Sequence, residues 1–169
     1  MRPTSWLWLV LGVALCGCAG YRLGPTNGVV AGTRSIQVNL FRNETPEPRL
    51  IESVAGALRQ QLQQDGTYHL ATHGDGDLVV DGVILRYERA PVSFQPTDII
   101  TVQDYSVSMF ARVIAVERAT GHTNLNRIVE AKTTLRAGND LASAERQALP
   151  LLAADLARIV SGWLVDGTW

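Results

Sequence analysis

Residues 100–117, ITVQDYSVSMFARVIAVE, carry the clearest secondary-structure signal of the chain. Apolar or aromatic side chains occupy every second position from residue 105 to residue 115, with Ser106, Ser108 and Arg112 on the alternate positions. A period of two is typical of a β-strand, because successive side chains point to opposite faces of the sheet. We therefore expect a long antiparallel strand in a sheet that other elements cover on one face only.

The segments around this strand predict the rest of the sheet. Residues 119–122, ATGH, are typical of a hairpin turn and lead into a second long strand at Thr123–Leu135. The stretch from Ala90 to Asp98 contains Pro91 and Pro96, so we expect a loop there. Further strands are predicted at Ser35–Phe41, Thr67–Ala71 and Leu78–Glu88.

Two amphipathic helices complete the predicted fold. For the first, Thr45 is expected to be the N-cap, Pro46 the first helical residue and Gly66 the end. The second begins after Asn139 or Asp140, and its interior Pro150 predicts a bend or a restart. The apolar stripe of the first helix is Leu50, Val54, Leu58 and Leu62, and that of the second runs from Leu141 to Trp163.

These elements define a fold class. Their order is β-α-β-β-β-α, which predicts an α+β two-layer sandwich with two helices packed on one face of a largely antiparallel sheet. The domain is assigned to residues 35–169, which is enough chain for one hydrophobic core.

The first 18 residues predict how the chain is exported and anchored. An apolar run of about ten residues follows Arg2, which is too short to span a bilayer and is typical of a signal peptide. The run closes in Leu15-Cys16-Gly17-Cys18, which resembles the lipobox of bacterial lipoproteins. That resemblance implies a signal peptide at 1–17, fatty acyl chains such as palmitate on Cys18, and a tether at 18–34. The alternative is an ordinary secreted protein with a chance cysteine.

Composition and motifs exclude several classes of function. The chain carries 15 basic and 16 acidic residues, so it has no strong positive field for nucleic acid. Both cysteines lie at the cleavage region, and no nucleophile elbow or phosphate-binding glycine loop is present. His69, His73, Asp75 and Asp77 form either a weak metal site or a solvated turn, and we favour the turn. We therefore expect no catalytic residue, no metal and no cofactor.

Basic side chains on the predicted strands are the candidate binding residues. Arg86 and Arg89 lie at the end of one strand, and Lys132 and Arg136 lie on the hairpin. Lys and Arg hold phosphates, Arg with a bidentate fork. If these residues share a polar face, they offer a site for an anionic headgroup. The alternative is ordinary solubilising charge, and the strand register that would decide between the two is not fixed by the sequence.

Three stretches of the chain resemble the LptE family of lipopolysaccharide-assembly lipoproteins. The first is Cys18-Ala19-Gly20-Tyr21-Arg22-Leu23. The second is residues 35–45, SIQVNLFRNET, a strand ending in a Phe-x-Asn-x-Thr turn, and the third is residues 76–84, GDLVVDGVI. Ala19 departs from the family's usual start, where Gly follows the cysteine directly.

The resemblance implies a function. Family members are lipid-anchored at the periplasmic face of the outer membrane of Gram-negative bacteria, where they plug the LptD β-barrel, help to assemble it and take part in inserting lipopolysaccharide into the outer leaflet. Contact of Arg86, Arg89, Lys132 and Arg136 with lipopolysaccharide phosphates is a hypothesis within that role. The alternative resemblance is to periplasmic lipoprotein modules that regulate envelope enzymes such as peptidoglycan synthases. The long hairpin favours the plug, because it exceeds what the smaller modules contain.

Overall fold

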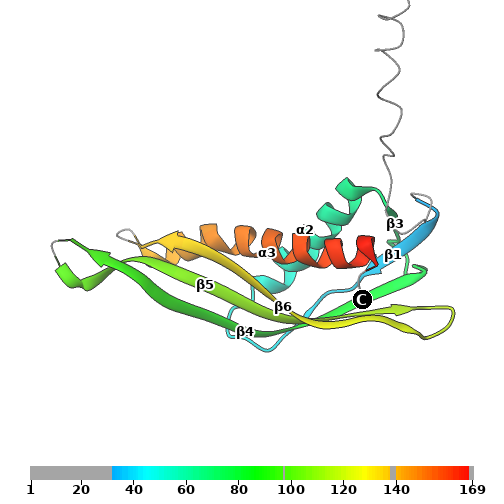
Figure 1. The fold of residues 1–169 in the computed structure, drawn as a ribbon, viewed down its shortest axis with the longest axis horizontal. Helices are drawn as coiled ribbons and strands as arrows, with labels where there is room; N and C mark the ends of the chain where they lie inside the picture. Colours follow the sequence, from blue (N-terminus) through cyan, green and yellow to red (C-terminus); the bar gives the residue numbers. More distant parts are fainter. Residues whose placement is uncertain (1–31, 97, 138–139, 168–169) are drawn as a thin grey trace, which may run out of the picture.

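The fold is seen in a computed structural model that describes residues 32–96, 98–137 and 140–167. Two helices lie on one face of a sheet, as Figure 1 shows, so the predicted α+β two-layer sandwich is confirmed. The elements are β1 (Arg34–Val38), β2 (Arg42–Asn43), α2 (Leu50–Asp65), β3 (Tyr68–Leu70), β4 (Leu78–Gln95), β5 (Asp98–Glu117), β6 (Thr123–Arg136) and α3 (Leu141–Asp166).

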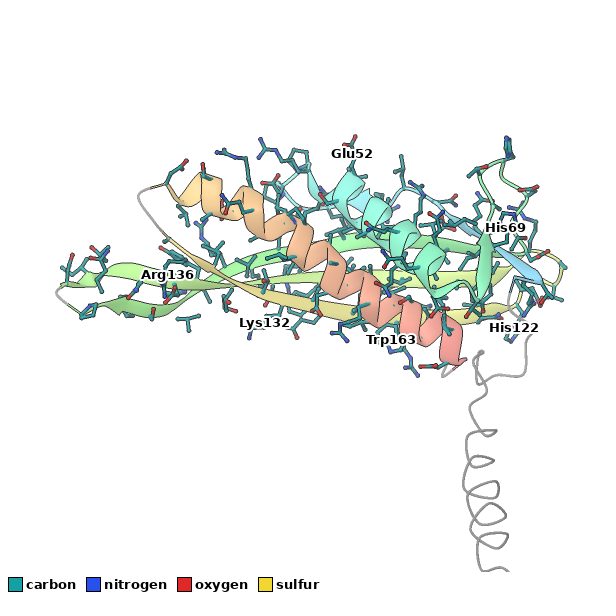
Figure 2. All side chains as sticks on the ribbon, turned by 90° about the horizontal axis from the view of Figure 1, so that it is seen from above. Glu52, His69, His122, Lys132, Arg136 and Trp163 are labelled. Atoms are coloured by element: carbon teal, nitrogen blue, oxygen red, sulfur yellow. The ribbon has the colours of Figure 1, made fainter. Side chains whose placement is uncertain are left out.

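The sheet combines a long antiparallel meander with short parallel strands. Its order is β3-β1-β4-β5-β6, with β2 pairing separately with β4. The pairs β4–β5 and β5–β6 are antiparallel, whereas β1 is parallel to both β3 and β4. The β4–β5 hairpin extends beyond the start of α3 in both views of the whole molecule (Figures 1 and 2).

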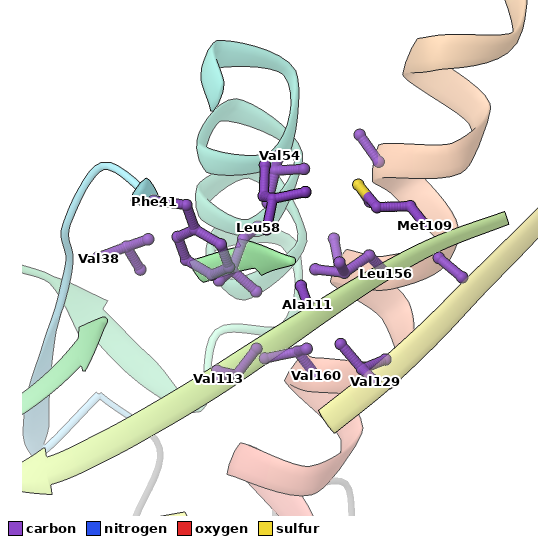
Figure 3. Packing of buried hydrophobic residues seen from close by; sticks show 14 of the residues in the cluster. Val38, Phe41, Val54, Leu58, Met109, Ala111, Val113, Val129, Leu156 and Val160 are labelled. Carbon is purple, nitrogen blue, oxygen red and sulfur yellow. The ribbon is translucent and has the colours of Figure 1, made fainter. Parts of the chain in front are cut away.

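The core lies between the meander and the two helices (Figure 3). The alternation predicted for β5 is confirmed, because the inward residues from position 107 to position 115 are completely buried. Burying a Leu- or Val-sized side chain contributes roughly 1.5–3 kcal/mol, so this face fixes the register of the sheet. The inward side chains are Val107, Met109, Ala111, Val113 and Ala115 from β5, Leu125, Val129 and Leu135 from β6, and Leu50, Val54, Leu58, Leu62, Leu152, Leu156 and Val160 from the helices.

The first helix ends as predicted but begins later. Gly66 closes α2 in the left-handed conformation, with φ of 74°. The predicted start at Thr45 and Pro46 is wrong, because Arg49 is the N-cap. A residue that precedes proline is disfavoured in the helical region, so Glu47 before Pro48 delays the helix by a turn.

Two strand predictions also need correction. The predicted strand Ser35–Phe41 ends early, because β1 stops at Val38, the buried Phe41 lies in the segment that follows, and the separate strand β2 begins only at Arg42. The loop predicted at Ala90–Asp98 is wrong, because β4 continues to Gln95. Beyond Ile84, β4 pairs only with β5 among the described strands, so its other edge is unpaired. Pro91 is tolerated there because an edge strand can lack an N–H donor.

The second helix is continuous. Asp140, one of the two predicted caps, accepts a hydrogen bond from the Ser143 amide. Of the bend or restart predicted at Pro150, the restart does not occur, because α3 continues through it. In the described part of the chain α3 is the one helix long and apolar enough to cross a membrane, and half of its most apolar stretch is buried in the fold. Such burial is typical of a helix that packs in the core of a folded domain.

Candidate functional site

The candidate site is the face of β4, β5 and β6 that points away from α2 and α3, which we call the open face. Phe110 lies between the buried Met109 and Ala111 on β5, so its side chain points to the open face. Its register partners Arg86 on β4 and Glu130 on β6 share that face. The next rows along the sheet are Glu88–Ser108–Lys132 and Ala90–Ser106–Thr134.

The register places three of the four predicted cations on this face and one on the other. Arg86, Lys132 and Arg136 belong to the open face, and the last two lie four residues apart along β6 (Figure 2). Arg89 pairs with the buried Val107 and therefore lies on the helix side.

Arg89 has a structural environment of its own. Its guanidinium forms an ion pair with Glu145 of α3 and lies over the Tyr105 ring, 5.3 Å from the centroid. A guanidinium held by a carboxylate and an aromatic face ties the start of α3 to the sheet. Sequence reasoning grouped Arg89 with Arg86, but β4 pairs with β5 without a break from Arg86 to Pro91, so these two residues, three apart, lie on opposite faces of the sheet.

Carboxylates neutralise two of the cations on the open face. Arg86 forms an ion pair with Glu88 at 2.8 Å and stacks on Phe110 at 4.4 Å from the ring centroid. Arg136 forms one with Asp104 at 3.1 Å. A hydrogen bond from Ser93 and then the Arg136 guanidinium hold the pKa of Asp104 below its usual 3.8, so Asp104 is charged at neutral pH.

Two exposed cations on this face have no carboxylate partner in the described part of the chain. They are Lys132 on β6 and Arg112 on β5. Arg112 pairs in register with Ile128 of β6. Strand geometry separates their Cα atoms by about 14 Å. Sequence reasoning recognised that Arg112 is basic but did not rank it as a site residue. Its place in the alternation of residues 100–117 is the signal that assigns it to this face.

The half of the open face toward the β1 end is rich in aliphatic side chains, which sequence reasoning missed. Its rows present five aliphatic side chains together with Asp81 and Arg112, and Ile128 is 55% exposed; we call these rows the apolar half. The signal was available, because Ile114 and Val116 interrupt the polar positions of β5. An apolar area bordered by charged residues is typical of a surface that binds a partner. The aliphatic residues are Val79, Val83, Ile114, Val116 and Ile128.

We call the rows from Arg86–Phe110–Glu130 to Asp104–Arg136 the charged half of the open face. Among its described residues, one buried hydroxyl group has no hydrogen-bond partner. Ser106 Oγ is buried, and among the described residues it is the one buried side-chain polar atom that makes no hydrogen bond. It lies one row from Ser108 and Lys132. A buried hydroxyl without a partner costs free energy, so this position suits a polar group supplied by a ligand or partner.

The histidine turn does not form a metal centre in the residues that the structure defines. His73 Nδ1 contacts the Thr72 hydroxyl at 3.0 Å, and Asp77 accepts hydrogen bonds from the amide and hydroxyl of Ser35, each at 2.8 Å. No three ligating side chains from this part of the chain converge. The other predicted site residue, Cys18, lies outside the described residues.

Comparison with known proteins gives the family of this chain. The family model described as LptE, lipopolysaccharide assembly, matches residues 33–160. The chain belongs to the LptE family, as its motifs predicted. The family assembles lipopolysaccharide and is not a family of enzymes. No curated protein matches the chain.

Several solved structures share the fold. Protein XCC0632 from Xanthomonas campestris has a TM-score of 0.61 at 10% identity, covering 87% of this chain and 92% of its own. The hypothetical protein CT253 from Chlamydia trachomatis has a TM-score of 0.58 at 12% identity, covering 80% and 96%. A minor lipoprotein from Acinetobacter baumannii has a TM-score of 0.53 at 12% identity, covering 80% and 94%. At these identities the likeness establishes the fold.

Proposed function

We propose that this chain is an outer-membrane lipoprotein that plugs an LptD-type β-barrel, helps to assemble it and takes part in inserting lipopolysaccharide into the outer leaflet. The observation that carries the proposal is the LptE family match over residues 33–160, which spans every described strand and most of α3. In this role the protein works by binding and positioning, without a catalytic group.

The open face supports a plug. The lumen of an outer-membrane barrel is polar, so a protein inside it needs a surface that forms hydrogen bonds without leaving charges unpaired. The charged half of the open face meets most of this need, because Arg86 and Arg136 carry their own carboxylates, and it leaves Lys132 and the Ser106 hydroxyl as the groups that a partner would have to satisfy. The aliphatic rows, which include the exposed Ile128 on the edge strand β6, give the contact with the barrel its hydrophobic part.

Anchoring in this proposal rests on Cys18. One acyl chain binds a membrane only weakly, so the several chains of a bacterial lipoprotein are needed for stable attachment. Within this arrangement Lys132 and Arg112 are the residues available for lipopolysaccharide phosphates, because neither is neutralised by a described carboxylate.

The test is purification of the acylated protein from outer membranes in mild detergent, followed by identification of what is recovered with it. We expect a barrel protein of LptD size in equal amount. Ile128→Glu places a charge in the apolar half and should abolish recovery of the barrel, whereas Arg158→Gln, an exposed change on α3, should not. Recovery of the protein alone, or with a peptidoglycan synthase, would reject the plug and favour the regulatory module.

A further inference from the structure

A cavity of about 450 Å³ lies where the parallel strands β1 and β3 end. These two strands are neighbours at the end of the sheet where the described chain begins (Figure 1), and α2 contributes one side chain to the cavity. The cavity is separate from the open-face rows of β5 and β6. It is lined by Gln37, Val38, Asn39, Leu40, Arg59, Leu70, Ala71, Thr72 and Gly74.

Arg59 of α2 is the one charged side chain in this lining. It is half-buried, and its Nη2 donates a hydrogen bond to the main-chain carbonyl of Val38 at 2.7 Å. That bond uses one of the five N–H donors of a guanidinium and fixes the orientation of the group. An arginine held in this way loses little side-chain entropy when its remaining donors bind an anion.

Two polar residues of the lining, Gln37 and Asn39, are held by hydrogen bonds to each other and to neighbouring segments. Gln37 Nε2 donates to Asn39 Oδ1 at 2.7 Å, and Asn39 Nδ2 donates to Asp81 at 2.8 Å. Arg118 in turn donates to Gln37 Oε1 at 2.7 Å. These bonds hold the two amide side chains in place before any ligand arrives.

The character of the lining indicates one class of ligand. Among the residues that the structure describes, no carboxylate lines the cavity, so no acidic group of this lining balances the charge of Arg59. Leu40 is 63% exposed at the rim, and Leu70 and Ala71 add apolar surface. We propose that this cavity binds a carboxylate or phosphate group attached to a small apolar moiety, with Arg59 holding the anion. This site is additional to the plug function and does not depend on it.

The test follows amide resonances of the full acylated, ¹⁵N-labelled protein in neutral dodecyl maltoside micelles, titrated at constant ionic strength. The probes are sodium acetate, inorganic phosphate and dihexanoyl phosphatidic acid. We expect saturable shifts at the amides of Leu40 and Thr72. Arg59→Gln should weaken binding by about tenfold or more, because a charge-assisted hydrogen bond is lost. Arg146→Gln, on an exposed position of α3, should leave binding unchanged.

A second variant makes the test independent of the bond between Arg59 and Val38. Ala71→Leu fills the cavity but keeps Arg59 and the main-chain bond from Ala71 to Ile36, and it should also abolish the saturable shifts. Tighter binding of the phosphatidic acid than of acetate would assign the anion to a lipid phosphate, and tighter binding of acetate would assign it to a small carboxylate. Binding of inorganic phosphate as tight as either would overturn the assignment of an apolar moiety. Shifts that do not saturate, or that persist in both variants, would overturn the proposal.

Discussion

The ring of Phe41 lies directly against the backbone of Gly82, so that a β-carbon at residue 82 would fall 2.5 Å from the ring's Cζ. Phe41 is 2% exposed and belongs to the segment between β1 and β2, whereas Gly82 lies in the middle of β4. The contact explains why a strand interior contains a glycine, since a larger residue would push the ring out of the core.

The first prediction therefore concerns Gly82→Ala. Overpacking a core costs about 1–3 kcal/mol, and we expect a loss of that size in the free energy of unfolding measured with urea. Gly56→Ala is the matched control, because Gly56 is an exposed residue within α2 with no atom near its added β-carbon. It should increase stability by about 0.5–1 kcal/mol, since alanine is the better helix former. Equal effects at the two positions would contradict the role assigned to Phe41.

Local sequence patterns predicted the central strands and the cores of both helices, because each of those elements has one buried face. Val107 to Ala115 on β5 and Leu50 to Leu62 on α2 are buried with the periods expected of a strand and a helix. The sequence alone did not predict the extension of β4 through Pro91. The strand conformation of this extension depends on pairing with β5, and the paired residues are far apart in the sequence.

The binding face was predictable only in part, for the same reason. Strand alternation alone separates Arg86 from Arg89, which are three residues apart, but which of the two faces outward depends on the bulge in β4 and on its pairing with β5. The cavity around Arg59 had no local signal. It arises because the ends of β1 and β3 meet one residue of α2 in space, and no periodicity or motif in the sequence reports that meeting.

The second prediction concerns pH. Hydrogen bonds from the amide and hydroxyl of Ser35 lower the pKa of Asp77 below its usual 3.8. A folded-state pKa below the unfolded value means that the carboxylate stabilises the fold above about pH 4 and that this contribution disappears as the pH falls through the lowered pKa. The Asp77→Asn variant should therefore have a lower free energy of unfolding than the original chain at pH 6, and the difference should shrink as the pH falls below 4.

Ser35→Ala provides an independent check on the same pair. It removes the hydroxyl donor, so the pKa of Asp77 should move up toward its usual value in a carboxyl titration followed by NMR. If Asp77→Asn has the same effect at pH 6 and at pH 2, the charge of Asp77 is not the source of the stabilisation.

The third prediction concerns Pro150, an exposed residue inside α3. A proline within a helix lacks an N–H donor and crowds the carbonyl of residue Arg146, although it also restricts the unfolded chain. Pro150→Ala should therefore raise the free energy of unfolding by about 2 kcal/mol. Ala154→Pro, one turn later on an exposed position, should lower it by about 3 kcal/mol. A destabilising effect of Pro150→Ala would indicate that the proline has a packing role.

The fourth prediction separates the two faces of the sheet. Lys132→Gln and Arg112→Gln each remove an unpaired cation from the open face, and each should weaken lipopolysaccharide binding about fivefold to tenfold. Arg89→Gln breaks the contacts with Glu145 and Tyr105 on the helix side, so it should lower stability by up to about 1 kcal/mol and leave binding unchanged. The measurements are binding of fluorescently labelled lipopolysaccharide and urea unfolding, both on the purified acylated protein. Because the three variants each remove one positive charge, a uniform loss of binding would mean that lipopolysaccharide responds to net charge. If only Lys132→Gln and Arg112→Gln weaken binding, the lipopolysaccharide phosphates are bound at the open face.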